Sequence, residues 1–185
     1  MNNLALTFAD QGRWKEAEEL GAQVVETSKR VLGGEHPKTL ASMSNLALIF
    51  RNQGRWKEAE ELGEQELKIC KRVLGEEHPD TLVSINNLAL TFLEQGRWKK
   101  AEELGAQVVE TRKRVLGEEH PGTLISMSNL ALTFADQGRW KEAEELGVQV
   151  VETSKRVQGE EHPDTLTNIS NLVLIQQRSK RRPEI

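Results

Sequence analysis

A run of nineteen residues, NLALTFADQGRWKEAEELG, occurs at 3–21 and again without a change at 129–147. The two copies are 126 residues apart, which is three times 42, and several other residues return at the same period. These are Gly12, Gly54, Gly96 and Gly138; Trp14, Trp56, Trp98 and Trp140; and His36, His78, His120 and His162, each followed by proline. A catalytic centre needs one set of reactive groups, whereas a stack of similar units needs the same packing residues in every unit. The repetition therefore predicts an array of structural repeats.

Each 42-residue repeat contains two helical patterns separated by a glycine. In the third repeat, Leu82, Ile85 and Leu88 recur at steps of three and four, which places them on one face of a helix. Gly96 stands where a left-handed residue ends a helix, and a second apolar pattern continues to Gly117. We therefore expect each repeat to form a helix of about 14 residues, a tight turn and a helix of about 20 residues, with no strand.

The His-Pro pairs mark the corners between repeats. Proline is tolerated in the first turn of a helix, so Pro121 predicts a helix start, and Asp80 or Thr81 is expected to cap the corresponding helix. The four histidines do not favour a metal site. Neighbouring helices pack about 10 Å apart, whereas zinc ligands lie about 2 Å from one ion. The histidines are interpreted as corner or capping residues.

Comparison of aligned positions within the chain predicts which side chains reach solvent. Val24 aligns with Glu66, and a carboxylate is costly to bury, so this position is expected near solvent. Ser28 aligns with Cys70 and Arg112, which indicates a second exposed position.

Two other columns are expected in the interior. Trp56 and Trp98 are predicted to be largely buried between repeats. Glycine inside a helix costs about 1 kcal/mol relative to alanine, yet every repeat has one in its second helix. We therefore expect another helix to pass too close for a Cβ at these positions, which are Gly21, Gly63, Gly105 and Gly147.

Composition narrows the class of protein. The 185 residues include 25 Lys plus Arg against 29 Asp plus Glu, and a net charge of −4 does not favour nucleic-acid binding. The hydrophobic share of 37% is low for a compact globule and suits an elongated array. A single cysteine fits a reducing compartment, and no apolar run approaches the roughly 18 residues of a membrane span. We expect a cytoplasmic protein that does not contact the membrane.

The spacing resembles the tetratricopeptide repeat (TPR). In the second repeat its motif positions are Met43, Leu46, Ala47, Phe50, Ala59, Gly63 and Pro79. The repeat is eight residues longer than the usual 34, and it begins with N-N-L-A and ends with G-x-x-H-P-D-T. In this it resembles the repeats of kinesin light chains and of fungal and bacterial NB-ARC and NACHT sensor proteins.

The resemblance covers residues 1–175 and implies an all-α fold, a right-handed α-solenoid superhelix of antiparallel helix pairs. The expected repeats are 1–42, 43–84, 85–126 and 127–168, with a partial repeat at 169–178 and a basic tail at 179–185.

The sequence contains no convincing catalytic pattern. Glu16, Glu18 and Glu19 precede no conspicuous base or acceptor, so a solvated helix face is favoured. Lys68 and Lys71 flank Cys70 and suggest a lowered thiol pKa, but the aligned serines argue against a reactive role. No glycine-rich phosphate loop is present. The chain is therefore predicted to be no enzyme and to need no cofactor or metal.

One asparagine recurs inside every first helix, although asparagine is a poor helix former. The column is Asn3, Asn45, Asn87, Asn129 and Asn171. The resemblance implies that these amides line a concave groove and bind the backbone of a peptide, because each amide offers both a donor and an acceptor. The alternative is that each amide bonds a neighbouring helix and shapes the array.

Two variable rows lie beside this column. One is mostly apolar (Ala41, Val83, Ile125, Thr167) and the other partly acidic (Asp10, Asn52, Glu94, Asp136). Together they suit an extended peptide with basic side chains. The basic tail, which includes Arg178, Lys180, Arg181 and Arg182, is interpreted as a solvated terminus, with a nuclear-import or acidic-partner patch as the alternative.

The first hypothesis is therefore a scaffold that binds a peptide or partner protein in the groove. The second is a homo-oligomer formed through exposed array ends, because residues 1–10 and 169–178 are expected to lack part of their packing. A detached repeat module of a larger sensor protein is a further alternative.

Overall fold

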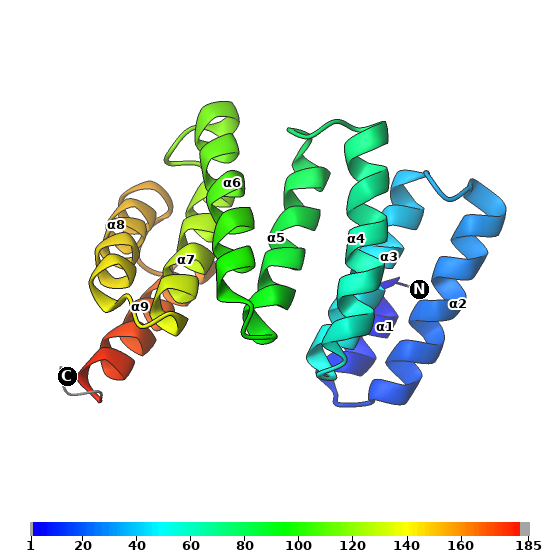
Figure 1. Ribbon diagram of the computed structural model, residues 1–185, viewed down its shortest axis with the longest axis horizontal. Coiled ribbons are helices and arrows are strands. Elements are labelled where there is room, and N and C mark those ends of the chain that lie inside the picture. The colour runs from blue at the N-terminus through cyan, green and yellow to red at the C-terminus, as the bar shows by residue number, and fades with distance from the viewer. Residues whose placement is uncertain (1, 182–185) are drawn as a thin grey trace. The chain divides into compact units, whose positions relative to one another are not determined.

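The computed structural model describes residues 2–181, and the side chains from Leu4 onward; Met1 and residues 182–185 lie outside the described part. Within it there are nine helices and no strand (Figure 1). Their bounds are α1 Asn2–Asp10, α2 Trp14–Leu32, α3 Pro37–Asn52, α4 Trp56–Val73, α5 Pro79–Glu94, α6 Trp98–Leu116, α7 Pro121–Asp136, α8 Trp140–Gln158 and α9 Pro163–Lys180. None of these helices is both long enough and apolar enough to cross a membrane. The predicted alternation is confirmed from α2 to α8, since α3, α5 and α7 have 16 residues and α2, α4, α6 and α8 have 18 or 19. The first helix α9 departs from it, with 18 residues.

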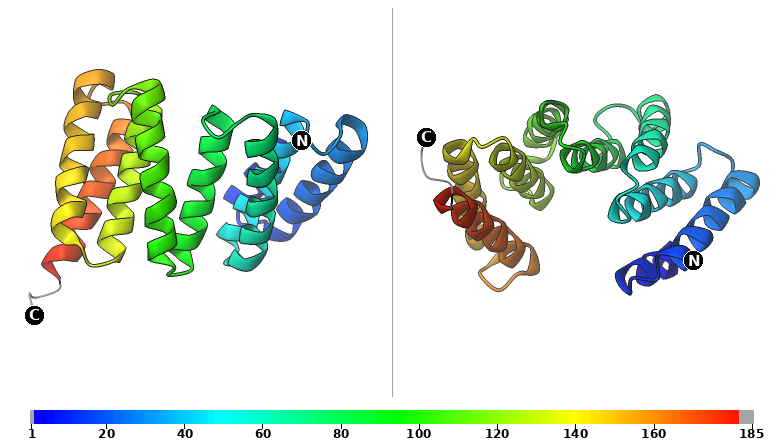
Figure 2. Two further views of the ribbon diagram at one scale, coloured as in Figure 1. Left: turned by 45° about the horizontal axis from the view of Figure 1, so that its top comes forward. Right: turned by 60° about the horizontal axis from the view of Figure 1, so that its bottom comes forward.

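The helices fall into two compact units, residues 1–95 with α1 to α5 and residues 96–185 with α6 to α9. Inside each unit, helices that follow one another pack as antiparallel neighbours (Figures 1 and 2). The first helices of successive repeats also contact each other directly, α3 with both α1 and α5 in the first unit and α7 with α9 in the second. The all-α solenoid of antiparallel helix pairs is thereby confirmed.

The glycine between the two helices of each repeat lies in the turn, as predicted. Gly54 has φ +74°, a left-handed conformation that costs residues with a Cβ more than glycine. Its N–H donates to the carbonyl of Arg51 and the next N–H, from Arg55, donates to the carbonyl of Phe50, both at 2.9 Å. These bonds satisfy carbonyls at the end of α3 that have no partner within the helix.

At each corner between repeats a histidine caps the N-terminus of the following first helix, as expected for these residues. In α3, α5, α7 and α9 the imidazole Nδ1 of the residue before proline accepts the backbone N–H two residues later, at 3.0–3.2 Å. The expectation that Asp80 or Thr81 caps α5 is wrong. Because proline occupies the first helical position, the cap falls on His78, and the hydroxyl of Thr81 donates instead to the carbonyl of Gly75 at 2.8 Å.

The core is a series of small clusters rather than one large centre. Two of the clusters combine a first helix with the second helices on both sides of it, and two others join successive first helices with the second helix between them. Such clusters are expected when a repeat buries its faces only against its neighbours. The cluster around α3 contains Val25, Leu40, Met43, Leu46 and Cys70. The cluster around α7 contains Val109, Leu124, Met127, Leu130 and Val150.

Trp56 and Trp98 lie at the surface, so the prediction that they are largely buried is wrong. Trp56 is 41% exposed and Trp98 is 45% exposed. Each tryptophan is the first residue of its helix, where the chain emerges from the turn. The core position of this segment belongs to the alanine three residues later, such as Ala59, which is buried.

The glycines within second helices face a leucine of the following first helix. A Cβ at Gly21 would lie 3.1 Å from Leu46 Cδ1, and a Cβ at Gly147 would lie 3.0 Å from Leu172 Cδ1. At Gly63 and Gly105 the corresponding distances are 3.6 and 3.4 Å, which are ordinary contacts. The predicted close approach is therefore present at two of the four positions, and it comes from a side chain.

Candidate functional site

The asparagine column lies on the first helices. The side chain of Asn3 is outside the described residues, while the side chains of Asn45, Asn87, Asn129 and Asn171 are half-buried on α3, α5, α7 and α9. Asn87 Nδ2 donates to Ser44 Oγ on α3 at 3.2 Å, and Asn171 Nδ2 donates to Ser128 Oγ on α7 at 3.1 Å. The amides of Asn87 and Asn171 thus link successive first helices, and each of these bonds uses one of the two N–H groups of its amide.

In the first unit two of these asparagines border a pocket. Asn45 and Asn87 line a cavity of about 250 Å³ between α3, α4 and α5. Ala41 and Val83, from the apolar row, lie on its wall and are themselves exposed. The structure therefore brings two of the amides and two residues of the apolar row to one pocket.

The pocket contains a carboxylate that the sequence analysis placed at the surface. Glu66 lines the cavity from α4 and is only 5% exposed. Its Oε1 lies 2.6 Å from Ser84 Oγ and 3.4 Å from Cys70 Sγ, so both groups can donate to it. Burial raises the pKa of Glu66 above that of an ordinary glutamate, although the hydrogen bonds act in the opposite direction.

The expectation of exposure at this column is wrong throughout. The aligned residues Val24, Val108 and Val150 are all buried, as Glu66 is. The substitution of glutamate for valine does not mark a position near solvent, because polar groups of α4 and α5 satisfy the carboxylate in the interior.

In the column of Cys70, three residues are buried, contrary to expectation, and Ser28 is half-buried. Cys70 has no exposed surface, and burial raises its pKa to about 11, which keeps it a thiol at neutral pH. In the second unit the aligned Arg112 is buried too, and its Nη1 donates to Ser126 Oγ and to the carbonyl of Gly122, each at 2.7 Å. A guanidinium is thus accommodated inside the repeat because hydroxyl and carbonyl oxygens surround it.

Replacing Glu66 with Val is expected to increase the free energy of unfolding at pH 7, on the order of 1–3 kcal/mol, by removing a desolvated acid. Because the pKa of Glu66 is raised in the folded state, at pH values between the unfolded-state and folded-state pKa the native protein keeps a proton that the unfolded chain has released. The penalty is therefore absent at pH values below the unfolded pKa, grows as pH rises toward the folded pKa, and is constant above it.

Urea unfolding of both proteins at several pH values checks this. The advantage of Glu66→Val should vanish toward pH 4. An advantage that is equal at pH 4 and pH 7 would mean that ionisation of Glu66 does not cause it.

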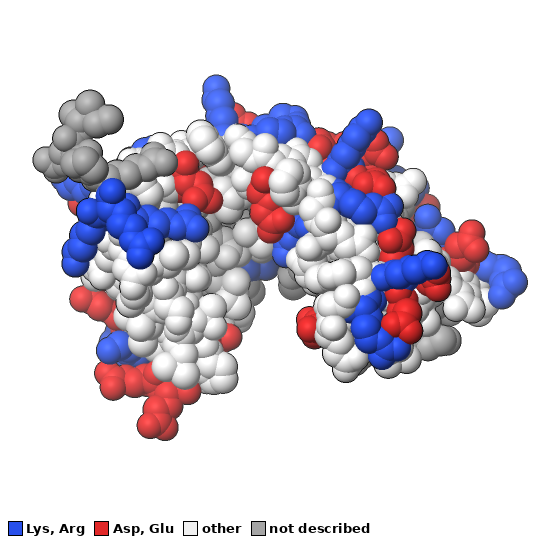
Figure 3. Space-filling model, turned by 90° about the horizontal axis from the view of Figure 1, so that it is seen from below, with Lys and Arg blue, Asp and Glu red and all other residues white. Residues whose placement is uncertain are grey.

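In the partly acidic row beside the asparagine column, Glu94 and Asp136 already form ion pairs with arginines of the chain. Arg51 lies 3.5 Å from Glu94, and Arg178 Nη1 donates to Asp136 at 2.7 Å. Figure 3 shows charges of both signs interspersed with wide uncharged areas, and a cluster of basic side chains at the C-terminal end of α9. Lys180 and Arg181 of the basic tail are exposed there, while Arg182 is outside the described residues. Because of the ion pairs of Glu94 and Asp136, the partly acidic row offers a basic ligand fewer unpaired carboxylates than its sequence suggests.

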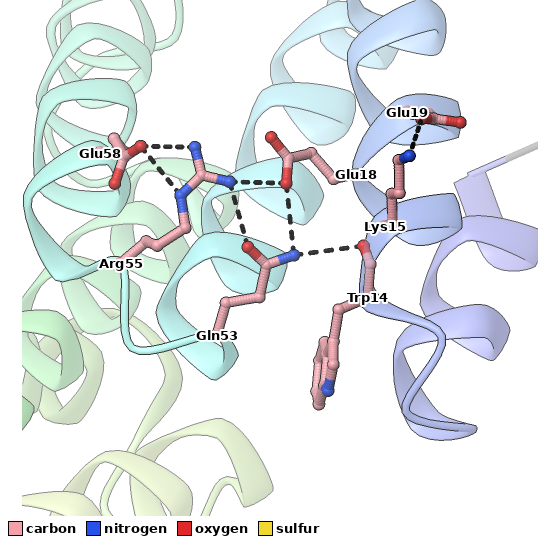
Figure 4. Close-up of polar contacts among 7 residues, drawn as sticks. All are labelled: Trp14, Lys15, Glu18, Glu19, Gln53, Arg55 and Glu58. Carbon is pink, nitrogen blue, oxygen red and sulfur yellow. Dashed lines mark hydrogen bonds and ion pairs between the residues drawn. The ribbon is translucent and has the colours of Figure 1, made fainter.

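The glutamates at the start of the second helices have a structural role where the turns meet (Figure 4). Arg55 bridges Glu58 of its own repeat and Glu18 of the preceding repeat, the latter at 2.6 Å, and Gln53 Nε2 donates to the carbonyl of Trp14 at 3.2 Å. In the second unit Arg139 and Gln137 reach Glu102 in the same way, each at 2.7 Å. These contacts join consecutive repeats, and ion pairs this exposed contribute little stability individually.

The comparisons with known proteins agree with this architecture. The family model described as "Tetratricopeptide repeat" matches residues 1–71, 43–114 and 95–156, which together span most of the chain. The chain belongs to the tetratricopeptide repeat family. No curated protein matched it.

Solved structures place this TPR protein beside kinesin-light-chain-like repeats. Two crystal structures of a Podosopora anserina putative kinesin light chain with nearly identical TPR-like repeats, one of them a point variant, are 36% identical to it. They match 98% of this chain and 85% and 86% of theirs, with TM-scores of 0.79 and 0.78. BtubC (BKLC) from P. vanneervenii gives a TM-score of 0.78 over 96% of this chain and 73% of its own, and at 22% identity it shows the fold alone. The predicted resemblance to the TPR and to the repeats of kinesin light chains is confirmed.

Proposed function

We propose that this TPR protein is a non-catalytic scaffold that binds an extended peptide segment of a partner protein along the face formed by α3 and α5. The observation that supports the proposal is the pocket on this face, where Asn45 and Asn87 stand beside the exposed side chains of Ala41 and Val83. Such a combination of apolar wall and convergent polar groups is typical of binding sites.

The chemistry of the amides suits a peptide backbone. An asparagine side chain presents two N–H groups and a carbonyl, and the bond from Asn87 to Ser44 uses one N–H. Packed helices lie about 8–10 Å apart, and an extended strand rises about 3.3 Å per residue. Amides on neighbouring first helices are therefore spaced to meet every third peptide group of a bound strand, without requiring a particular sequence.

A pair of single substitutions tests the role of Asn87. Asn87→Ala is expected to weaken the binding of peptides selected from a random library about 2- to 10-fold, because one neutral hydrogen bond contributes about 0.5–1.5 kcal/mol. Ser44→Ala removes the same bond between the helices but leaves the amide in place, so peptide affinity should be nearly unchanged. Isothermal titration calorimetry measures both dissociation constants.

Unfolding curves of the same two variants provide the control for structure. If both variants lose similar stability and neither loses affinity, Asn87 serves only to join α5 to α3. A library that yields no binding peptide at all would contradict the scaffold proposal itself.

A second candidate is self-association through α9. Leu166 is 51% exposed, whereas the aligned residues Leu40, Leu82 and Leu124 are at most 3% exposed within the repeats. The face of α9 that carries Leu166 and Val173 is thus apolar and accessible, which supports pairing with another helix. A molecular mass that falls on dilution, measured by sedimentation, would favour this candidate, and a monomer at all concentrations would remove it.

A further inference from the structure

We propose that the pocket between α3, α4 and α5 receives one arginine side chain of the bound peptide, with the guanidinium beside the carboxylate of Glu66. This rests on the proposed function and adds the class of side chain that the site selects.

The charge of the pocket favours a cation. Two carboxylate residues, Glu66 and Asp80, line it, and among the described residues that line it none is Lys or Arg. Glu66 is nearly inaccessible to bulk solvent, so a cation that reaches it replaces water in an environment where electrostatic attraction is stronger. An acidic side chain would instead meet two groups of its own charge.

The size of the pocket fits one side chain. Its volume is about 250 Å³, below the range of about 300–1,000 Å³ that is usual for small-molecule sites. One water molecule takes about 30 Å³, so the cavity has room for several waters or for the end of a long side chain. The exposed Val83 on the wall can pack against the aliphatic part of that chain.

The second unit already holds a guanidinium at the aligned position. There Arg112 donates to Ser126 Oγ and to the carbonyl of Gly122. One repeat earlier, the aligned acceptors are Ser84 Oγ and the carbonyl of Asp80, which lie 3.0 Å from each other. The same oxygen atoms are therefore provided twice, once with an arginine from within the chain and once beside an open pocket.

Two differences between the aligned sites account for the open pocket. Arg112 is replaced by Cys70, a much shorter side chain, and Val108 is replaced by Glu66, which adds a carboxylate. The first difference vacates the space and the second supplies the counter-charge. Arginine is preferred to lysine because its planar fork can bond the carboxylate and a second acceptor at the same time.

The test uses a small probe that needs no selected peptide. N-acetyl-arginine methylamide is titrated into the isotope-labelled full chain, and NMR follows the side-chain amides of Asn45 and Asn87. Saturable shifts at these amides are expected. N-acetyl-citrulline methylamide has nearly the same shape without the charge and should bind at least 10-fold more weakly.

Three variants locate the site. Glu66→Gln keeps the shape of the side chain and should weaken arginine binding at least 10-fold, whereas Glu64→Gln removes a charge from the exposed surface of the same helix and should change it less than 2-fold. Cys70→Arg fills the pocket with the residue of the third repeat and should block the probe. Circular dichroism verifies that each variant is folded.

Equal binding of the arginine and citrulline probes, or unchanged binding in a folded Glu66→Gln variant, would overturn the pocket assignment. Failure of the scaffold proposal has a different signature. If the arginine probe binds as described but the random library yields no peptide, the pocket stands and the extended groove does not. If library peptides bind equally well with arginine or citrulline, the groove stands and the arginine site does not.

Discussion

Replacing Met43 with Ala is expected to lower the free energy of unfolding by about 2–5 kcal/mol, because it opens a cavity in a packed core. Met43 has no exposed surface and lies in the cluster that joins α2, α3 and α4. Trp56→Ala should cost less than Met43→Ala despite the larger side chain, since Trp56 is 41% exposed. Urea unfolding of the two variants under the same conditions gives both values.

The order of these two effects is the informative result. If Trp56→Ala destabilises the protein more than Met43→Ala, tryptophan rather than the small apolar clusters joins the repeats, as the sequence analysis expected. Repeat arrays can unfold in steps, so the transition should be monitored by both circular dichroism and tryptophan fluorescence.

Changing Asn45 and Asn87 together to Ala is expected to weaken peptide binding about 5- to 150-fold. Two neutral hydrogen bonds at about 0.5–1.5 kcal/mol each account for this range if their effects add. The helix content should stay the same, because alanine favours a helix more than asparagine does. Fluorescence anisotropy with a labelled library peptide measures the affinity.

Gln65→Ala is the matched control for the double variant, because Gln65 is an exposed amide side chain on α4 that lies outside the asparagine column and does not line the pocket. It should bind the peptide like the wild-type chain. A double variant that unfolds would favour a structural role for the column. One that stays folded and binds normally would remove the asparagines from the site.

The features that depend on local structure were predictable from sequence. The 42-residue period, the turn at Gly54 and the corner at His78 all follow from residues whose preferences act within a few positions along the chain. A left-handed turn favours glycine, and proline at the first helical position leaves the preceding residue to cap the helix. The exact cap was missed because histidine is a less common capping residue than Asp or Thr.

Burial at the level of single side chains was decided by the tertiary structure. The alignment of Glu66 with valines predicts an exposed position, because a carboxylate is costly to bury. In the structure Ser84 and Cys70 stand beside the carboxylate, and it is buried like the valines. Position 66 is four residues before position 70, so the two departures from the repeat lie on one helix face. These two departures on one face of α4 are the feature of the sequence that could have indicated a buried polar site.

The sequence by itself determined the repeat, the helices and their order, because each repeat specifies its own turns and its own apolar face. Only the tertiary structure decided that Trp56 lies at the surface and that Glu66 and Asn87 border one pocket. The physical reason is that these properties depend on side chains from the adjacent repeat. A pocket between α3, α4 and α5 arises from the fit of three helices, which no period within one of them encodes.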